Sequence, residues 1–368
     1  MSRFINAERS LTRLLGSRAV AALAYPHAVD RYLESLNPIW STHEVRARVV
    51  AIRHQTADTV TLQLRPNAHW NGFIPGQFIN LSVEVDGVRR SRCFSPANSA
   101  HDAGLIELTA RVQEGGKVTP YLKSRLQVGE VVTLSAADGE FALPAQRPEN
   151  LLLISGGSGI TPVMAMLRTL ADEQYAGAIS FLHYARSAAD QLYGAELQAL
   201  AQQLPQLRLL RVYEQGSDGE AQGRFNIEQL GTLVPDFAQA ETFLCGPPGL
   251  MQAVENSYRD CKLLDQLHQE RFTAPAPLAI NAGEVSGELR FAHSERLTDN
   301  DGRSILEQAE TAGLSPKHGC RMGICSTCSC RKTSGVVRNL LTGELSGSEA
   351  EDVRICVSAP VGDVTLDL

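Results

Sequence analysis

The sequence predicts a multidomain protein with an antiparallel β-barrel, an α/β domain on a parallel sheet, and a small α+β domain. The chain has 368 residues, more than one hydrophobic core usually organises. Short alternating apolar runs fill residues 45–147, and solid apolar runs separated by helical patterns follow. Five of the 8 cysteines lie between Cys320 and Cys356, which marks the last part as a separate unit.

Composition narrows the class of protein. The chain is 43% hydrophobic and 20% charged, as in an ordinary globular enzyme, and its formal net charge is -7. Because phosphate contacts need clustered Lys and Arg, we expect no nucleic-acid partner. Clustered cysteines in a large acidic chain indicate a metal site rather than a disulfide framework, and hence a cytoplasmic protein.

Residues 1–44 form an N-terminal leader. Apolar side chains alternate with arginines over residues 3–24, a pattern that predicts an amphipathic helix. The stretch Ala19–Tyr25 is too short and begins too late for a signal-peptide core. Two interpretations are open: the helix packs on the body of the protein, or it docks to a partner or to the inner face of a membrane.

Two different patterns of apolar residues follow the leader. Short runs bounded by Gly, Pro and Asp predict the antiparallel barrel over 45–147, and solid runs predict the parallel sheet over 148–272. An Ala/Pro-rich linker covers 273–284, and the α+β domain covers 285–368. The expected strands are Val45–Ile52, Thr59–Leu64, Phe78–Val85, Ile106–Val112 and Val131–Ala136, then Leu151–Ile154, Ala178–Tyr184, Leu207–Tyr213 and Thr242–Cys245.

The strongest motif is a C-x4-C-x2-C spacing followed by a distant cysteine. This is the plant-type [2Fe–2S] pattern, in which four thiolates surround two irons. Structural zinc is the rival interpretation, but zinc sites usually show two C-x2-4-C pairs. Cys330 falls outside the pattern and is expected to pack in the core. The expected metal ligands are Cys320, Cys325, Cys328 and Cys356.

Three loops combine glycine with a helix start at proline. Thr119 is expected to cap a helix that begins at Pro120, and Thr161 a helix that begins at Pro162. The sequence Cys245-Gly-Pro-Pro248 opens a third helix. Glycine lets a ligand approach the backbone, and helix N-termini favour anions, so the two loops of the parallel domain predict a nucleotide site.

Residues 45–272 resemble the ferredoxin-reductase superfamily. The resemblance is carried by Arg92-Cys-Phe-Ser95, Pro75-Gly-Gln-Phe78 and the three loops, in the family's usual order. It implies that Arg92 neutralises a flavin phosphate, that Phe94 packs on the isoalloxazine and that Ser95 hydrogen-bonds near N5. The family usually has Tyr where Phe94 stands, so the hydroxyl is missing here.

The same resemblance extends the flavin site. Gly116 and Thr119 are expected to bind a pyrophosphate, which indicates FAD rather than FMN. Glu270 and Phe272 are expected near the flavin at the end of the last parallel strand. With Cys245, which is expected beside the hydride path, Ser95 and Glu270 are the candidate catalytic residues.

The nicotinamide site is implied by the loops of the parallel domain. Its expected residues are Gly157, Gly159, Thr161, Cys245, Gly246 and Pro247. Arg186 and Ser187 end the second parallel strand, where an Arg suits a 2′-phosphate and an acidic residue suits NADH. We therefore expect NADPH, with NADH as the alternative, and Tyr193 and Arg224 as further candidates.

Residues 285–368 resemble the plant-type ferredoxins, whose fold is a β-grasp, with a helix over Ser304–Ala312 and a last strand over Asp363–Leu368. A hydride carries two electrons and a [2Fe–2S] cluster accepts one, so a flavin must stand between them. The expected enzyme is an NAD(P)H:acceptor oxidoreductase that passes electrons from NADPH through FAD and the cluster to an acceptor protein.

The acceptor is expected by resemblance alone. The order of domains is similar to reductases of oxygenase, hydroxylase and desaturase systems. The leader is similar to reductases of bacterial membrane fatty-acid desaturases, which makes a desaturase the first expectation, a soluble oxygenase the second and a hybrid-cluster protein the third. In a different class, the chain would be a redox-sensing binding protein; steady NADPH-dependent cytochrome c reduction that collapses in Cys325→Ser distinguishes the two.

Overall fold

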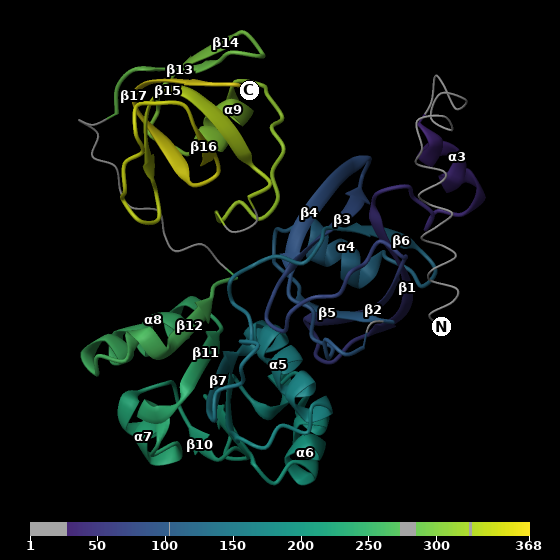
Figure 1. Ribbon diagram of the computed structural model, residues 1–368, viewed down its shortest axis with the longest axis vertical. Coiled ribbons are helices and arrows are strands. Elements are labelled where there is room, and N and C mark those ends of the chain that lie inside the picture. The colour runs from purple at the N-terminus through teal and green to yellow at the C-terminus, as the bar shows by residue number, and fades with distance from the viewer. Residues whose placement is uncertain (1–27, 103, 273–284, 324–325) are drawn as a thin grey trace. The chain divides into compact units, whose positions relative to one another are not determined.

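The computed structural model describes residues 28–102, 104–272, 285–323 and 326–368, which form two compact units that divide near Phe272 (Figure 1). The predicted helix over 3–24 and the predicted linker 273–284 lie outside the described residues. The described part of the leader contains α3 (Val29–Leu36). No helix in the described ranges is long and apolar enough to cross a membrane.

The first sheet is the predicted antiparallel barrel. Its six strands lie in the order β4-β3-β6-β1-β2-β5, beside the short helix α4 (Val118–Ser124). Along β3, alternate residues are buried, so one face of the sheet packs into the barrel core. The strands are β1 (Val45–Arg53), β2 (Thr59–Pro66), β3 (Ile79–Val85), β4 (Val88–Phe94), β5 (Ile106–Arg111) and β6 (Val131–Leu134).

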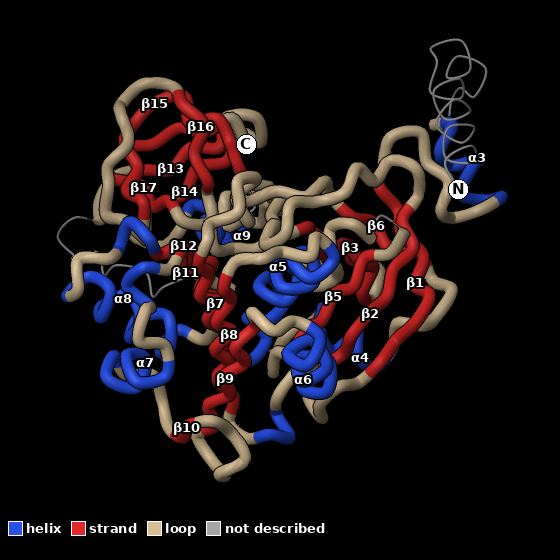
Figure 2. The backbone as a smooth tube through the Cα atoms, turned by 60° about the horizontal axis from the view of Figure 1, so that its bottom comes forward, coloured by secondary structure: helices blue, strands red, loops and turns tan. Residues whose placement is uncertain are grey.

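The second sheet is the predicted parallel sheet, in the order β10-β9-β8-β7-β11-β12. Leu151 and Leu153 pack with α5 (Ile160–Asp172) and α6 (Gly194–Gln203), whereas Leu152 and Ile154 pack in the core that contains α7 and α8. Helices therefore cover both faces (Figure 2). The remaining elements are β7 (Asn150–Gly156), β8 (Ala178–Ala185), β9 (Leu207–Tyr213), β10 (Ala221–Gln222), β11 (Glu241–Cys245), β12 (Leu267–Glu270), α7 (Ile227–Leu233) and α8 (Pro248–Asp260).

In its described residues, the second unit is a mixed sheet that packs with the helix α9, as predicted for an α+β ferredoxin domain. Its strands lie in the order β14-β13-β17-β15-β16, and α9 (Ile305–Thr311) begins at a capping box made by Ser304 and Glu307. Lys332 is fully buried, and its ammonium donates to three backbone carbonyls. The strands are β13 (Glu288–Phe291), β14 (Arg296–Asp299), β15 (Ser329–Asn339), β16 (Glu351–Arg354) and β17 (Ser358–Leu366).

Two predicted helix starts are wrong. α4 begins at Val118, and the Thr119 hydroxyl accepts from the Gln113 N–H at 2.9 Å, so it closes the preceding turn instead of capping the helix. α5 begins at Ile160 after a short 3-10 turn, and the Thr161 hydroxyl donates back to the Ser158 carbonyl. The third start, at Pro248, is as predicted.

Candidate functional site

Three strand ends meet at one edge of the parallel sheet. In the strand register, Cys245 of β11 lies between Ser155 of β7 and Glu270 of β12. The carboxyl ends of parallel strands are where such sheets bind ligands. The structure therefore places Cys245 and Glu270, two of the three predicted catalytic residues, on neighbouring strands.

The third predicted catalytic residue comes from the barrel. The Ser95 hydroxyl donates to Glu270 Oε2 at 3.1 Å, and both side chains are buried. Burial raises the pKa of Glu270 to about 8, against the opposing effect of the Ser95 hydrogen bond. At neutral pH this carboxyl group therefore holds a proton, and Ser95 connects it to the barrel.

The two glycine loops of the parallel domain lie against each other. A Cβ built on Gly159 would lie 2.3 Å from the Cys245 carbonyl oxygen, and one built on Gly156 would lie 2.7 Å from Pro247 Cδ. A Cβ on Gly246 would also lie 3.1 Å from the Gly156 nitrogen. Only glycine fits these positions, and the close packing brings the backbones of both loops to the same edge of the sheet.

Cys245 does not have the environment of a nucleophile. Its side chain is fully buried, and burial together with the nearby Glu270 raises the pKa of the thiol. A neutral thiol contributes its shape and weak polarity rather than a thiolate.

The predicted flavin residues lie along the barrel. Phe94 ends β4 and is half-buried against the barrel core, and Arg92 of the same strand donates to the Ser91 carbonyl at 2.7 Å. Phe272 packs against the core between β7 and α5. A larger residue would not fit easily at Gly116, because its Cβ would lie 2.9 Å from the Gln113 carbonyl oxygen.

The predicted 2′-phosphate residues are both engaged by one carboxylate. Asp190 lies 3.2 Å from Arg186 Nη2 and accepts from the Ser187 hydroxyl at 2.7 Å. Tyr193, a further candidate, is instead buried, and its hydroxyl lies 2.5 Å from the hydroxyl of Thr109 in the barrel. It is therefore a packing residue.

Sequence reasoning missed two residues beside this site. Arg111 ends β5, and its Nη1 would lie 3.1 Å from a Cβ on Gly157; Asp58 precedes β2 and pairs with Arg111. The sequence offered one signal for Arg111: it is a charged residue at the end of a predicted barrel strand. Arg224, by contrast, is highly exposed and pairs with Glu214.

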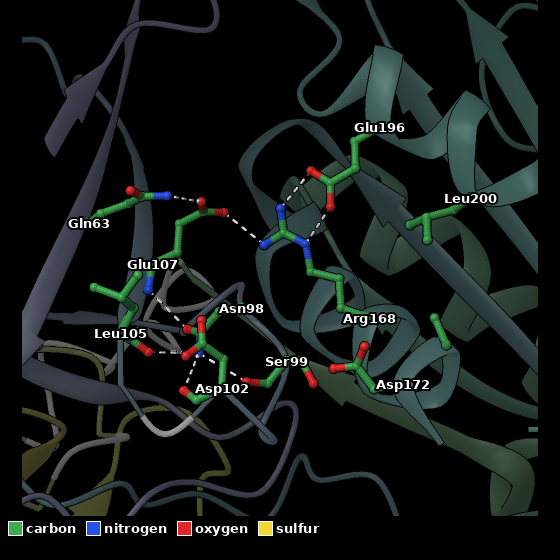
Figure 3. A pocket seen from close by; sticks show the side chains of 11 residues that line it. Gln63, Asn98, Ser99, Asp102, Leu105, Glu107, Arg168, Asp172, Glu196 and Leu200 are labelled. Atoms are coloured by element: carbon green, nitrogen blue, oxygen red, sulfur yellow. Dashed lines mark hydrogen bonds and ion pairs between the residues drawn. The ribbon is translucent and has the colours of Figure 1, made fainter. Parts of the chain in front are cut away.

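A separate cavity of about 360 Å³ lies between the barrel and the parallel domain (Figure 3). Arg168 of α5 forms a bidentate pair with Glu196 of α6 and lies 2.7 Å from Glu107 of β5. Its guanidinium also covers the ring of Tyr193. None of the predicted cofactor residues is among those that line this cavity, so we assign it to joining the two domains.

Three of the four predicted cluster ligands are buried in the second unit. Cys320, Cys328 and Cys356 are buried free thiols, and Cys325 lies outside the described residues. The hydrogen bond with Cys328, and burial, raise the pKa of Cys356, and the Met322 N–H points to Cys320 Sγ at 3.3 Å.

These thiols are donors of the kind that a [2Fe–2S] cluster needs. Within the described ranges, which leave out Cys325, no three His, Cys, Asp or Glu side chains are grouped closely enough to hold one metal ion. A neighbouring thiol pair with a donated N–H near a third sulfur is the donor set that an iron–sulfur cluster uses.

Family models match three segments in the predicted order. They describe an oxidoreductase FAD-binding domain over residues 47–143, an oxidoreductase NAD-binding domain over 153–256 and a 2Fe-2S iron-sulfur cluster binding domain over 292–361. The predicted cofactor classes, FAD, a nicotinamide nucleotide and a [2Fe–2S] cluster, are thereby confirmed.

Relatives match nearly the whole chain. An NADPH oxidoreductase of Mycobacterium tuberculosis is 35% identical over 356 residues, which cover 95% of this chain and 91% of the relative. A glycine betaine monooxygenase reductase subunit of Pseudomonas aeruginosa is 29% identical over 90% of this chain and 98% of the relative. The solved phthalate dioxygenase reductase shares the fold, with a TM-score of 0.60 at 21% identity over 88% of this chain and 98% of that one. The chain therefore belongs to the ferredoxin-reductase type of NAD(P)H oxidoreductases that join FAD, nucleotide and [2Fe–2S] domains in one polypeptide.

Proposed function

We propose that the chain takes hydride from NADPH onto FAD and delivers the electrons singly, through its [2Fe–2S] cluster, to an oxygenase. The convergence of Ser95, Glu270 and Cys245 beside the two glycine loops carries this proposal. When bound, FAD exchanges two electrons with the nucleotide and one at a time with the cluster. The monooxygenase and dioxygenase reductases among the relatives support an oxygenase as acceptor.

The catalytic roles follow from the burial of this group. Glu270 holds a proton on its carboxyl group, and the Ser95 hydroxyl donates to that group at 3.1 Å, so this pair would hold a proton beside the flavin once FAD is bound. Cys245 and the backbone of Gly246 and Pro247 shape the space for the nicotinamide ring. All three catalytic side chains are buried, so bulk water has little access to them.

The binding roles that we propose are those that the family resemblance implies. We assign Arg92, Phe94, Gly116, Thr119 and Phe272 to FAD. Gly157, Gly159 and Thr161 are assigned to the nucleotide pyrophosphate, Arg186 and Ser187 to the 2′-phosphate of NADPH, and Cys320, Cys325, Cys328 and Cys356 to the cluster. We keep the boundaries 1–44, 45–147, 148–272, 273–284 and 285–368 for the leader, flavin domain, nucleotide domain, linker and ferredoxin domain.

A membrane desaturase is the second candidate acceptor. Tyr32, Leu36 and Trp40, which follow the leader helix predicted from the sequence, are exposed apolar side chains, with Leu36 77% exposed. Such side chains suit contact with a membrane that holds the acceptor. Sedimentation with anionic vesicles that is lost in Leu36→Ser supports this candidate; the absence of sedimentation argues against it.

The cysteines supply a matched test of the electron path. Cys328→Ser should remove the cluster absorbance and most NADPH-dependent cytochrome c reduction while the flavin stays bound. Cys330→Ser is the control, because that thiol lies two residues away and contacts backbone carbonyls instead. An unchanged rate in Cys328→Ser would mean that the cluster lies off the path.

A further inference from the structure

A carboxylate from the barrel lies between two arginines at the nucleotide loop. Asp58 Oδ2 is 3.1 Å from Arg111 Nε and 4.0 Å from Arg186 Nη2. Arg111 ends β5 of the barrel, whereas Arg186 follows β8 of the parallel sheet. One anion therefore pairs with cations from both domains of the first unit.

Arg111 lies against the loop assigned to the pyrophosphate. Its Nη1 would be 3.1 Å from a Cβ on Gly157. Two buried polar atoms here, Arg111 Nε and His183 Nε2, make no hydrogen bond to any described residue, although Asp58 is within ion-pair distance of the former. Burial and the charge of Arg111 lower the pKa of His183 to about 3, so the imidazole is neutral. The guanidinium of Arg111 is thus the cation at this loop, with hydrogen-bonding capacity left for a ligand.

Asp58 is ionised at neutral pH. Burial disfavours its charge, but the hydrogen bond from Thr56 and the charges of Arg111 and Arg186 outweigh burial, so the pKa of Asp58 lies below its ordinary value. Asp190 neutralises part of the remaining charge on Arg186. Arg111 and Arg186 are therefore already paired with two carboxylates, those of Asp58 and Asp190, before a nucleotide binds.

We infer that Asp58 is a specificity-determining residue, an internal anion that competes with the nucleotide phosphates for Arg111 and Arg186. This inference rests on the proposed nucleotide site and adds a barrel residue to it. The 2′-phosphate of NADPH carries nearly two negative charges at neutral pH, whereas the adenosine ribose of NADH carries none. Repulsion by Asp58 therefore weakens NADPH binding more than NADH binding.

The test uses the holoenzyme and Asp58→Asn, which keeps the side-chain size and removes the charge. Dissociation constants for NADP⁺ and NAD⁺ are measured from the change in flavin absorbance at low ionic strength. We expect both constants to fall, because both nucleotides carry the pyrophosphate that Arg111 faces, and we expect the constant for NADP⁺ to fall about three- to tenfold further because of its 2′-phosphate. High salt should shrink the difference.

Two variants serve as controls. Asp86→Asn removes a carboxylate from another arginine pair of the barrel, Asp86 with Arg125 at 2.8 Å, and should leave both constants unchanged. Asp58→Glu keeps the charge and should keep the wild-type ratio of the two constants. Bound FAD in each variant reports that the first unit is folded.

The outcomes separate this inference from the proposed cofactor choice. The wild-type ratio of the two constants tests that choice, and a preference for NAD⁺ would refute it. The change of the ratio in Asp58→Asn tests the role of Asp58 whichever nucleotide the wild type prefers. Equal changes for both nucleotides, or weaker binding of NADP⁺, would overturn the inference, because Asp58 would then not distinguish a nucleotide with a 2′-phosphate from one without it.

Discussion

Replacing Glu270 by glutamine should change how stability depends on pH. Below pH 4.5, the ordinary pKa, the carboxyl group is protonated in both the folded and the unfolded chain. Between 4.5 and about 8, the unfolded chain has lost the proton and the folded chain keeps it, so stability falls as pH rises. Above about 8 both states are ionised and the decline stops.

The size of the effect follows from this window. At about 1.4 kcal/mol per pH unit, raising the pKa from 4.5 to about 8 corresponds to a loss of up to about 5 kcal/mol. Glutamine has the same shape and no ionisation, so Glu270→Gln should escape this loss. Relative to the wild type, the variant should gain about 4 kcal/mol between pH 5 and pH 8.5, because the first part of the window lies below pH 5.

Thermal unfolding, followed by the fluorescence of released FAD, measures this gain. We expect the difference in Tm between variant and wild type to grow by roughly 10 °C between pH 5 and pH 8.5. Glu173→Gln is the control: Arg147 lowers the pKa of Glu173, so that group is ionised throughout this range and the difference should stay constant. A Tm difference for Glu270→Gln that does not change with pH would refute the assigned burial and protonation of Glu270.

Three further substitutions test the packing that supports the site. Arg168→Met should leave Glu107 and Glu196 without their shared cation and lower the free energy of unfolding of the first unit by about 3–5 kcal/mol, as measured by urea denaturation. A change below about 1 kcal/mol would contradict the role given to Arg168 in joining the two domains. Lys332→Met should remove the ammonium that donates to three backbone carbonyls, at about 1–3 kcal/mol for each carbonyl left without another donor, so the cluster absorbance should disappear at a lower temperature than in the wild type. Gly159→Ala should weaken NADPH binding more than about tenfold, because its Cβ would meet the backbone of the neighbouring loop at 2.3 Å; unchanged binding would mean that this loop is not the nucleotide site.

Buried strands were predictable from the sequence, and the polar edge strand was not. The solid apolar run Leu151–Ile154 falls inside β7 (Asn150–Gly156), which is buried from its second residue onward, because a strand covered on both faces has no polar face to interrupt the run. β4 (Val88–Phe94) went unpredicted because it carries three arginines and lies at the edge of the sheet, where burial does not impose an alternating pattern.

Local chemistry was predictable from spacing, whereas pairing over long distances was not. Ser95 and Glu270 were each expected near the flavin, but their hydrogen bond joins residues 175 positions apart. The caps assigned to Thr119 and Thr161 failed because a hydroxyl at a Thr-Pro pair can bond backward into the preceding turn as easily as forward. Tyr193 was misjudged because its hydroxyl bonds to the barrel rather than to a ligand.

Anaerobic titration with NADPH, followed in the visible spectrum, tests the central claim most directly. If FAD takes two electrons and the [2Fe–2S] cluster takes one, complete bleaching of both requires about one and a half equivalents of NADPH per chain. Flavin and cluster bands should bleach together in the wild type, and Cys328→Ser should need about one equivalent. Bleaching of the flavin alone in the wild type, with the cluster left oxidised, would contradict transfer of electrons from the nucleotide to the cluster within this polypeptide.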